Sequence, residues 1–130
     1  EERQLWVHNH SRRLARQMRR LHDAGFDHRD LKFSNILVSA ALDDVRVWFL
    51  DLDGMRHWRH LPDQRMVQNL SRISVSAQAQ GLGSRSDRVR FLKMYLGHRR
   101  AAEWRAWWQR IAENSTKKLA LNQKRGRAIH

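Results

Sequence analysis

The chain has 130 residues, of which 41% are hydrophobic and 30% charged, which suits one core beneath a solvated surface. It contains no cysteine, which excludes a disulfide framework and a thiolate metal site, and no apolar run is long enough to cross a bilayer. The formal net charge of +13 favours phosphate-bearing partners, whether nucleotides, nucleic acid or anionic lipids, without choosing among them.

The first part of the chain predicts one helix followed by a small hairpin. Apolar residues at helical spacings predict a helix over residues 2–23, and Gly25 is placed to end it in the left-handed conformation. After a polar loop, "ILVSA" predicts a short strand over 36–40. A turn then leads into "VRVWFLDLDG", which predicts a second strand over 45–54 that breaks at its glycine.

The rest of the chain predicts helices. The periodic apolar residues from 63 to 80 indicate one helix, Ser84 can cap a second that ends before "GH", and residues 101–111 form a third. The tryptophans of that last helix are interpreted as a face packed on the core rather than as a platform for nucleic-acid bases, so no nucleic-acid partner is expected. We therefore expect a helical part over 63–113 and a basic C-terminal tail over 114–130, loose from "NQKRGRAIH" onward.

Polar chemistry is concentrated in the loop before the hairpin, "HRDLKFSNIL", which has the spacing of a kinase catalytic loop. Asp30 is a carboxylate that can accept the proton of an attacking hydroxyl. Lys32 can neutralise charge on the transferred phosphoryl group, and Asn35 offers an oxygen to Mg²⁺. His28 and Arg29 are expected to hold the loop in shape. The pattern indicates an ATP- and Mg²⁺-dependent phosphotransferase.

The end of the second predicted strand supplies further carboxylates in "FLDLDG". A kinase needs a second oxygen ligand for its metals on the strand that follows the catalytic loop. Asp51 is in the right place for that ligand, because the hairpin can return it to the catalytic loop. Strand alternation would give Asp53 the same side-chain direction, unless Gly54 turns the chain first.

The stretches "LHDAGFDHRDLKFSNILV" and "VWFLDLDG" resemble the C-terminal lobe of the protein-kinase-like fold and, more narrowly, the lipopolysaccharide core kinases, the Kdo and heptose kinase family. The later stretches "LSRISVSAQAQGLGSRSDRVRFLKMYL" and "WRAWWQRIAENSTKKLALNQKR" resemble the helical tail of that family, so the resemblance covers nearly the whole chain. It implies a mainly α fold with a small β-hairpin, the C-terminal lobe of an α+β kinase-like fold over residues 1–113.

The resemblance also implies a role for each polar residue. Asp30 would be the catalytic base and Lys32 would face the γ-phosphate of ATP. Asn35 and Asp51 would be the Mg²⁺ ligands, with Asp51 equivalent to the aspartate of Asp-Phe-Gly. Asp53 stands where that motif has glycine, which makes it a candidate for a second metal contact or an acceptor contact.

Two departures from the protein-kinase pattern bear on the substrate. The segment from Asp51 to Pro62 is short and "LPD" replaces Ala-Pro-Glu, which leaves little platform for a peptide and favours a glycan acceptor. The following helix has Asn69-Leu70 where the family often has Asp-Leu, so the charge of that aspartate is missing.

Three functions of different classes remain open: a kinase that phosphorylates a Kdo or heptose sugar of the lipopolysaccharide inner core, a protein serine/threonine kinase lobe, and a non-catalytic basic binding module. An anionic glycolipid acceptor suits the basic surface, which predicts a cytoplasmic protein placed peripherally on the inner face of the bacterial inner membrane. Neither a Gly-rich loop nor a strand lysine of the ATP-gripping N-terminal lobe is present, so we expect the isolated chain to have little or no activity.

Overall fold

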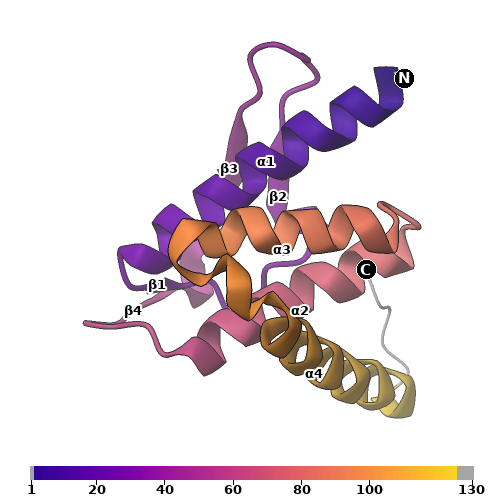
Figure 1. Ribbon diagram of the computed structural model, residues 1–130. Coiled ribbons are helices and arrows are strands. Elements are labelled where there is room, and N and C mark those ends of the chain that lie inside the picture. The colour runs from indigo at the N-terminus through magenta and orange to yellow at the C-terminus, as the bar shows by residue number, and fades with distance from the viewer. Residues whose placement is uncertain (1, 126–130) are drawn as a thin grey trace.

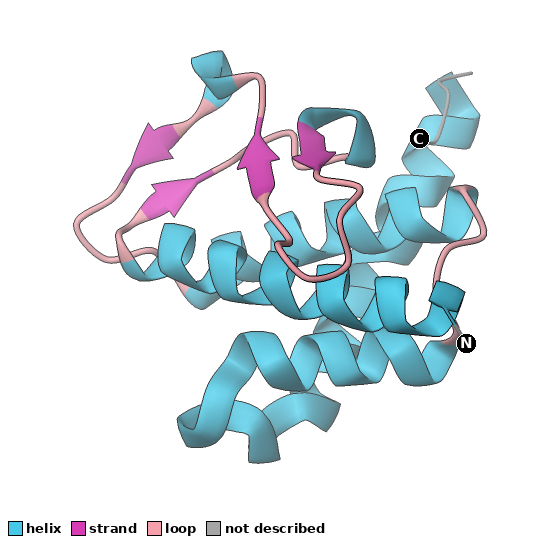
Figure 2. Ribbon diagram, turned by 90° about the horizontal axis from the view of Figure 1, so that it is seen from above, coloured by secondary structure: helices cyan, strands magenta, loops and turns pink. Residues whose placement is uncertain are grey.

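The computed structural model describes residues 2–125, and its helices pack around one core with the strands on one side, as Figures 1 and 2 show. The expected fold class, mainly α with a small β-hairpin, is confirmed. The helices and strands, in chain order, are α1 (Glu2–Asp23), β1 (Phe26–Asp27), β2 (Ile36–Val38), β3 (Val47–Phe49), β4 (Arg56–His57), α2 (Asp63–Ala79), α3 (Arg85–Arg100) and α4 (Trp104–Arg125).

The strands form two separate antiparallel pairs. Strands β2 and β3 make the predicted hairpin, with Leu37 opposite Trp48, and α1 lies across this hairpin in Figure 1. Strands β1 and β4 make a second, two-residue pair that the sequence did not indicate. This pair comes before and after the hairpin in the sequence. It therefore brings together the segment after Asp51 and the start of the loop over residues 28–35, which is called the catalytic loop here after its motif.

Gly25 is required where α1 turns into β1. Its φ of +86° lies in the left-handed region, as expected for a residue that ends a helix. A Cβ atom on Gly25 would lie 2.1 Å from the carbonyl oxygen of Trp58, whose backbone N–H donates to the Gly25 carbonyl at 2.7 Å. Glycine therefore permits both the turn and the close approach of the chain that follows β4.

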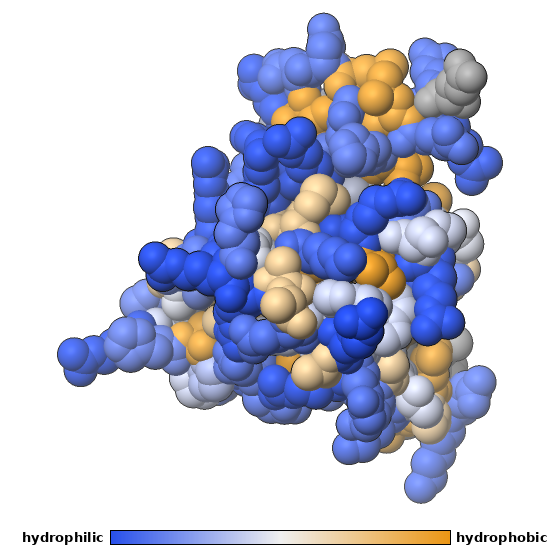
Figure 3. All heavy atoms as spheres, in the orientation of Figure 1, coloured by the Kyte–Doolittle hydropathy of each residue, from blue (hydrophilic) through white to orange (hydrophobic). Residues whose placement is uncertain are grey.

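The core joins all four helices to the catalytic loop. Its fully buried side chains, each at most 3% exposed, include Met18, Leu31, Val67, Leu92, Leu96 and Trp107. Trp104 and Trp108 pack against this cluster, which confirms that the tryptophans of α4 form a packed face. In contrast to this apolar core, the face of the molecule that Figure 3 shows is predominantly hydrophilic. Within the described residues, no helix has the length and apolarity that a membrane span requires.

Helix boundaries agree with the sequence in three places. Helix α1 spans the predicted residues, and Ser84 and Asp87 form a capping box at the start of α3. Gly97 interrupts the helical geometry with a φ of +70°, at the predicted "GH" break.

Two predicted boundaries are wrong. The strand expected over 45–54 ends at Phe49, because Asp51 adopts a left-handed conformation with φ +58° and residues 52–54 form a 3₁₀ turn. The helical part also does not end at residue 113, since α4 continues to Arg125. Residues 114–125 contain neither glycine nor proline, and Ser115 is buried, so packing favours continuation of the helix. The remainder of the expected tail, 126–130, lies outside the described residues.

Candidate functional site

The catalytic loop is anchored by apolar burial on both sides of its charged residues. Leu31 is fully buried in the core, which pins the chain between Asp30 and Lys32 and leaves their charged groups at the surface. Just beyond, the backbone N–H of Phe33 donates to the Ser76 hydroxyl of α2 at 2.9 Å. The loop then closes in a 3₁₀ turn over Phe33–Asn35. The alternation of charged and apolar residues in the motif thus fixes which side chains remain accessible.

The Asp30 carboxylate lies at the centre of the exposed charges. One oxygen, Oδ2, is 3.7 Å from Lys32 Nζ and accepts from the Asn35 amide at 3.3 Å. The other, Oδ1, accepts from Arg72 of α2, whose Nη2 and Nε lie 3.1 and 3.3 Å away. The motif therefore brings Asp30, Lys32 and Asn35 together as predicted, and α2 adds an arginine that sequence reasoning missed.

Asn35 links the loop to the strand that precedes Asp51. Its side-chain nitrogen donates to the Asp30 carbonyl at 2.8 Å. This bond fixes the orientation of the amide, so that the amide oxygen is the atom that could coordinate a cation. Its backbone carbonyl accepts from the Leu50 N–H at 2.8 Å. Because Leu50 is next to Asp51, the hairpin returns Asp51 toward Asn35.

The two acidic residues after β3 occupy different backbone settings. Asp51 is exposed in the left-handed conformation, and Asp53 is exposed in the 3₁₀ turn that follows. Strand alternation therefore does not apply to this pair, because the chain turns over Leu52–Gly54, which was the stated exception. In residues 2–125, no three His, Cys, Asp or Glu side chains gather closely enough to hold a metal by themselves. The oxygen atoms that could hold a cation at this site are the Asn35 amide oxygen and the Asp51 carboxylate.

His28 holds the loop from beneath. Its side chain is buried, and its Nε2 donates to the Leu50 carbonyl at 2.8 Å. Its Nδ1 accepts from the Asp30 N–H at 3.3 Å, which is consistent with that tautomer. Arg29 was expected to share this structural role, but it is exposed and makes no hydrogen bond or ion pair with the described residues.

A buried polar network underlies the loop and was not predicted. The Asn69 amide oxygen accepts from the His28 backbone N–H and from the His22 ring, both at 3.1 Å. Its nitrogen donates to Asp27 Oδ1 at 2.8 Å, and Asp27 Oδ2 accepts from Arg65 Nε at 2.7 Å. Asn69 thus holds the start of the catalytic loop through hydrogen bonds and carries no charge. The negative charge of this network lies on Asp27.

The electrostatics of this network follow from burial. Burial lowers the pKa of His22, although its contacts with Asn69 and nearby carboxylates oppose that effect. Burial alone would raise the pKa of Asp27, but hydrogen bonds from Arg65 and Asn69 and the charge of Arg65 lower it overall. The Tyr95 hydroxyl, whose pKa is raised by burial, lies 2.5 Å from His22 Nδ1 and donates to it. The network therefore favours neutral His22 and ionised Asp27.

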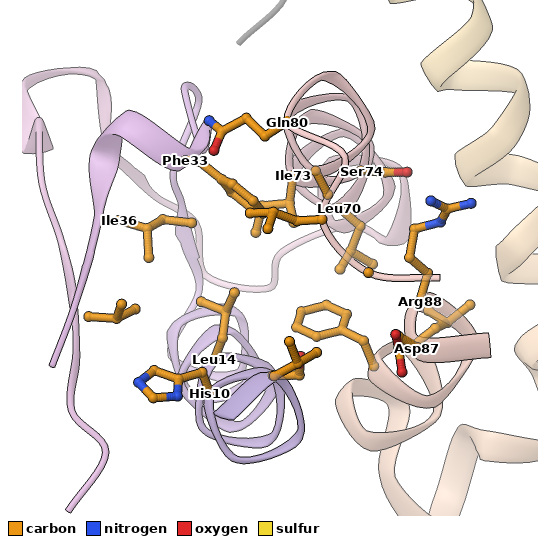
Figure 4. A pocket seen from close by; sticks show the side chains of 18 of the residues that line it. His10, Leu14, Phe33, Ile36, Leu70, Ile73, Ser74, Gln80, Asp87 and Arg88 are labelled. Atoms are coloured by element: carbon orange, nitrogen blue, oxygen red, sulfur yellow. The ribbon is translucent and has the colours of Figure 1, made fainter. Parts of the chain in front are cut away.

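A separate apolar cavity of about 340 Å³ lies behind the loop, between α1, β2, α2 and α3. Figure 4 shows Leu14, Phe33, Ile36, Leu70 and Ile73 directed into it from three sides. Phe33 belongs to the catalytic loop, so the cavity is adjacent to the site. Its lining is suited to an apolar group rather than to a phosphate.

Comparison with known proteins gives consistent matches. The family model of the "Lipopolysaccharide kinase (Kdo/WaaP) family" matches residues 4–95, which is more than half of the chain. A 3-deoxy-D-manno-octulosonic acid kinase of Vibrio cholerae serotype O1 is 34% identical over 65 residues, which are 50% of this chain and 26% of the relative. A solved structure described as "WaaP in complex with acyl carrier protein" is 26% identical, with a TM-score of 0.69, over 85% of this chain and 50% of the solved one. The chain therefore spans at most half the length of these relatives.

Proposed function

Because this chain belongs to the lipopolysaccharide kinase (Kdo/WaaP) family, we propose that it is the catalytic C-terminal lobe of an ATP-dependent phosphotransferase acting on a Kdo or heptose sugar of the lipopolysaccharide inner core. The observation that carries the proposal is the arrangement around Asp30. A carboxylate, a lysine and an amide lie on one loop, with the carboxylate about 3–4 Å from the lysine and amide nitrogens.

In this proposal, Asp30 orients the acceptor hydroxyl and takes its proton. The hydroxyl oxygen forms a bond to the γ-phosphorus of ATP, the bond from that phosphorus to the β–γ bridging oxygen breaks, and ADP leaves with the electron pair. Lys32 faces the transferred phosphoryl group and neutralises part of its charge. His28 and Asn69 keep the loop in the geometry that this transfer needs.

The donor set fits Mg²⁺, a hard cation that takes oxygen ligands and usually retains some water. Asn35 would offer its amide oxygen and Asp51 its carboxylate. The ion supplies charge neutralisation for the phosphates of ATP when it is bound. Asp53 stands two residues after Asp51 and is the proposed second metal or acceptor contact.

A glycolipid acceptor is favoured over a peptide by the short stretch between Asp51 and α2. Only η2 (Leu52–Gly54), β4 and a few loop residues separate them. The net charge of +13 supports an anionic acceptor and a peripheral position at the cytoplasmic face of the inner membrane. A protein serine/threonine kinase lobe is the first alternative, and a non-catalytic basic binding module is the second.

An acyl carrier protein is a further candidate partner, which sequence reasoning did not consider. The solved relative is described in complex with one. The apolar cavity beside the catalytic loop supports this proposal, because a lining of that kind would suit an acyl chain. Titration of the protein with acyl and acyl-free carrier proteins tests it, and equal affinity for both would remove the cavity from the proposal.

The test of the proposed function is phosphoryl transfer by the protein expressed from its full reading frame. The wild-type protein should transfer phosphate from ATP to a Kdo- or heptose-containing acceptor, as detected by mass spectrometry. Asp30→Asn should lower the rate by about 10²- to 10⁴-fold, the usual contribution of a general base. Asp43→Asn, the same change in an exposed hairpin residue, is the control. Activity retained by Asp30→Asn, or transfer to peptides alone, would refute the proposal.

A further inference from the structure

Helix α2 holds the catalytic loop along one stripe of its surface. Asn69, Arg72 and Ser76 are three and four residues apart, a spacing that places their side chains on one face of a helix. Asn69 accepts from the backbone N–H of His28 at 3.1 Å, and Ser76 accepts from that of Phe33 at 2.9 Å. The loop is therefore fixed to α2 through its backbone at both ends of the stripe. Arg72 lies between these two anchors.

Arg72 contacts the side chain at the centre of the loop rather than the backbone. Its Nη2 and Nε donate to Asp30 Oδ1 at 3.1 and 3.3 Å. Both donors belong to one planar guanidinium group, so together they restrict the direction of the carboxylate more than a single donor can. The two side chains are 24% and 39% exposed, and an ion pair with this exposure contributes little to stability. The main consequence of the contact is therefore the orientation of the Asp30 carboxylate.

The second carboxylate oxygen of Asp30 is held less tightly. Oδ2 accepts from the Asn35 amide at 3.3 Å, but that amide makes a shorter bond of 2.8 Å to the Asp30 carbonyl. Lys32 Nζ is 3.7 Å from Oδ2, beyond the range of a hydrogen bond. Oδ2 is therefore the oxygen with the capacity to accept a hydrogen bond from an incoming hydroxyl. Lys32 remains available to the transferred phosphoryl group.

We propose that Arg72 is a positioning residue for phosphoryl transfer, which holds Asp30 through Oδ1 so that Oδ2 takes the proton of the acceptor hydroxyl. The proton leaves the hydroxyl oxygen for Oδ2 as that oxygen bonds to the γ-phosphorus and ADP departs with the electron pair. The inference rests on the proposed function and adds to it a residue that lies outside the motif.

The same contact separates the tasks of the two cations beside Asp30. Arg72 balances the charge of the carboxylate, so Lys32 does not have to do so. Without Arg72, the carboxylate is free to rotate about its Cβ–Cγ bond, and Lys32 becomes the nearest cation. Loss of Arg72 therefore both misdirects the base and draws Lys32 away from the phosphoryl group.

The test is a double-mutant cycle on Asp30 and Arg72, measured as kcat and KM with a Kdo- or heptose-containing acceptor and the protein expressed from its full reading frame. Arg72→Gln should lower kcat by about 10- to 100-fold, the range expected when a hydrogen bond to a charged group is lost. The KM for ATP should not change, because Arg72 contacts Asp30 rather than the nucleotide. In the Asp30→Asn background the same change should lower kcat by less than about threefold, because residues that act as a unit are not additive.

Two variants separate positioning from a general effect of charge. Arg72→Lys keeps the charge but loses the two-donor fork, so its kcat should lie between those of the wild type and Arg72→Gln. Arg16→Gln, the same change at an exposed arginine of α1, should leave kcat unchanged. The melting temperature of Arg72→Gln should stay within about 4 °C of the wild type, because the pair is partly exposed. If it falls further, Arg72→Lys replaces Arg72→Gln in the cycle.

Three results would overturn the positioning role. The first is an unchanged kcat in Arg72→Gln, or a loss that appears in the KM for ATP alone. The second is an equal fold-loss of kcat with and without the Asp30 carboxylate, which is the result expected of a merely structural residue. The third is an Arg72→Lys variant with the kcat of the wild type, which would show that the two-donor fork is not needed.

The two proposals fail in different ways. If Asp30→Asn abolishes transfer to the sugar but the cycle shows no coupling, the role of Arg72 is wrong and the proposed function stands. If the protein transfers phosphate to a peptide or to water but to no sugar, the proposed function is wrong. The cycle measured on that acceptor then supports Arg72 by coupled losses and overturns it by additive ones. If the protein transfers phosphate to none of them, both proposals are wrong.

Discussion

The substitution Asn69→Asp replaces a donor with an acceptor at the centre of the buried network beneath the catalytic loop. In the wild type, the Asn69 nitrogen donates to Asp27 Oδ1 at 2.8 Å and to the Arg65 carbonyl at 2.9 Å. A carboxylate oxygen in its place would have no proton to donate to either one. It would also place two negative charges about 3 Å apart at a site that is 2% exposed.

The cost of this change has an upper limit set by protonation. One of the two carboxyl groups can take a proton and restore the hydrogen bond. Holding that proton at pH 7, against an ordinary pKa of about 3.9, costs about 4 kcal/mol. At pH 5 the same limit is about 1.5 kcal/mol. We therefore expect Asn69→Asp to lower the free energy of unfolding by about 3–4 kcal/mol at pH 7, and by much less at pH 5.

Urea unfolding at pH 5 and pH 7 measures both values. Gln78→Glu adds the same charge at an exposed position of the same helix and should change stability by less than about 0.5 kcal/mol. The reciprocal double variant Asp27→Asn/Asn69→Asp again sets one donor opposite one acceptor and should recover part of the loss. A loss that is equal at both pH values, or stability like that of the wild type at pH 7, would refute the reasoning.

Three further predictions follow from the same structure. Because burial lowers the pKa of His22, the protonated form is disfavoured in the fold, so stability should be complete above about pH 6.5 and decrease below it. His22→Gln should reduce that decrease in thermal melts between pH 5 and 7.5, and an identical profile would contradict this. Gly25→Ala should lower the free energy of unfolding by about 2 kcal/mol or more, because the new Cβ would meet the Trp58 carbonyl. Gly54→Ala, which has open space around it, should not lower it. Melting temperatures measured by calorimetry compare the two variants. The chain of 130 residues by itself should transfer little or no phosphate, and measurable turnover by the purified chain would disprove that.

The elements that the sequence predicted well depend on local information. The periodicity of apolar residues gave α1 its limits, and the capping residues gave α3 its start. The catalytic loop was recognisable because its polar residues lie within eight positions of one another. That spacing alone lets Asn35 reach the carbonyl and carboxylate of Asp30, five residues earlier.

The errors arose where local patterns were insufficient. In the run from 45 to 54, apolar residues alternate with polar ones at several positions, and β-branched and aromatic residues are present. The whole run therefore resembled a strand. The structure ends that strand at Phe49, because Asp51 turns to the left-handed region and residues 52–54 form a 3₁₀ turn. Likewise, a basic polar stretch is compatible with either a tail or a helix. Packing of α4 against α2 favours the helix.

The sequence by itself determined the motif, the order of helices and the residue types available for phosphoryl transfer, because helical periodicity, caps and short loops are set by neighbours in the chain. Only the tertiary structure placed Arg72 on Asp30 and Asn69 beneath His28. These contacts join residues more than 40 positions apart, and no spacing rule encodes them. They depend on how α2 packs beneath the loop.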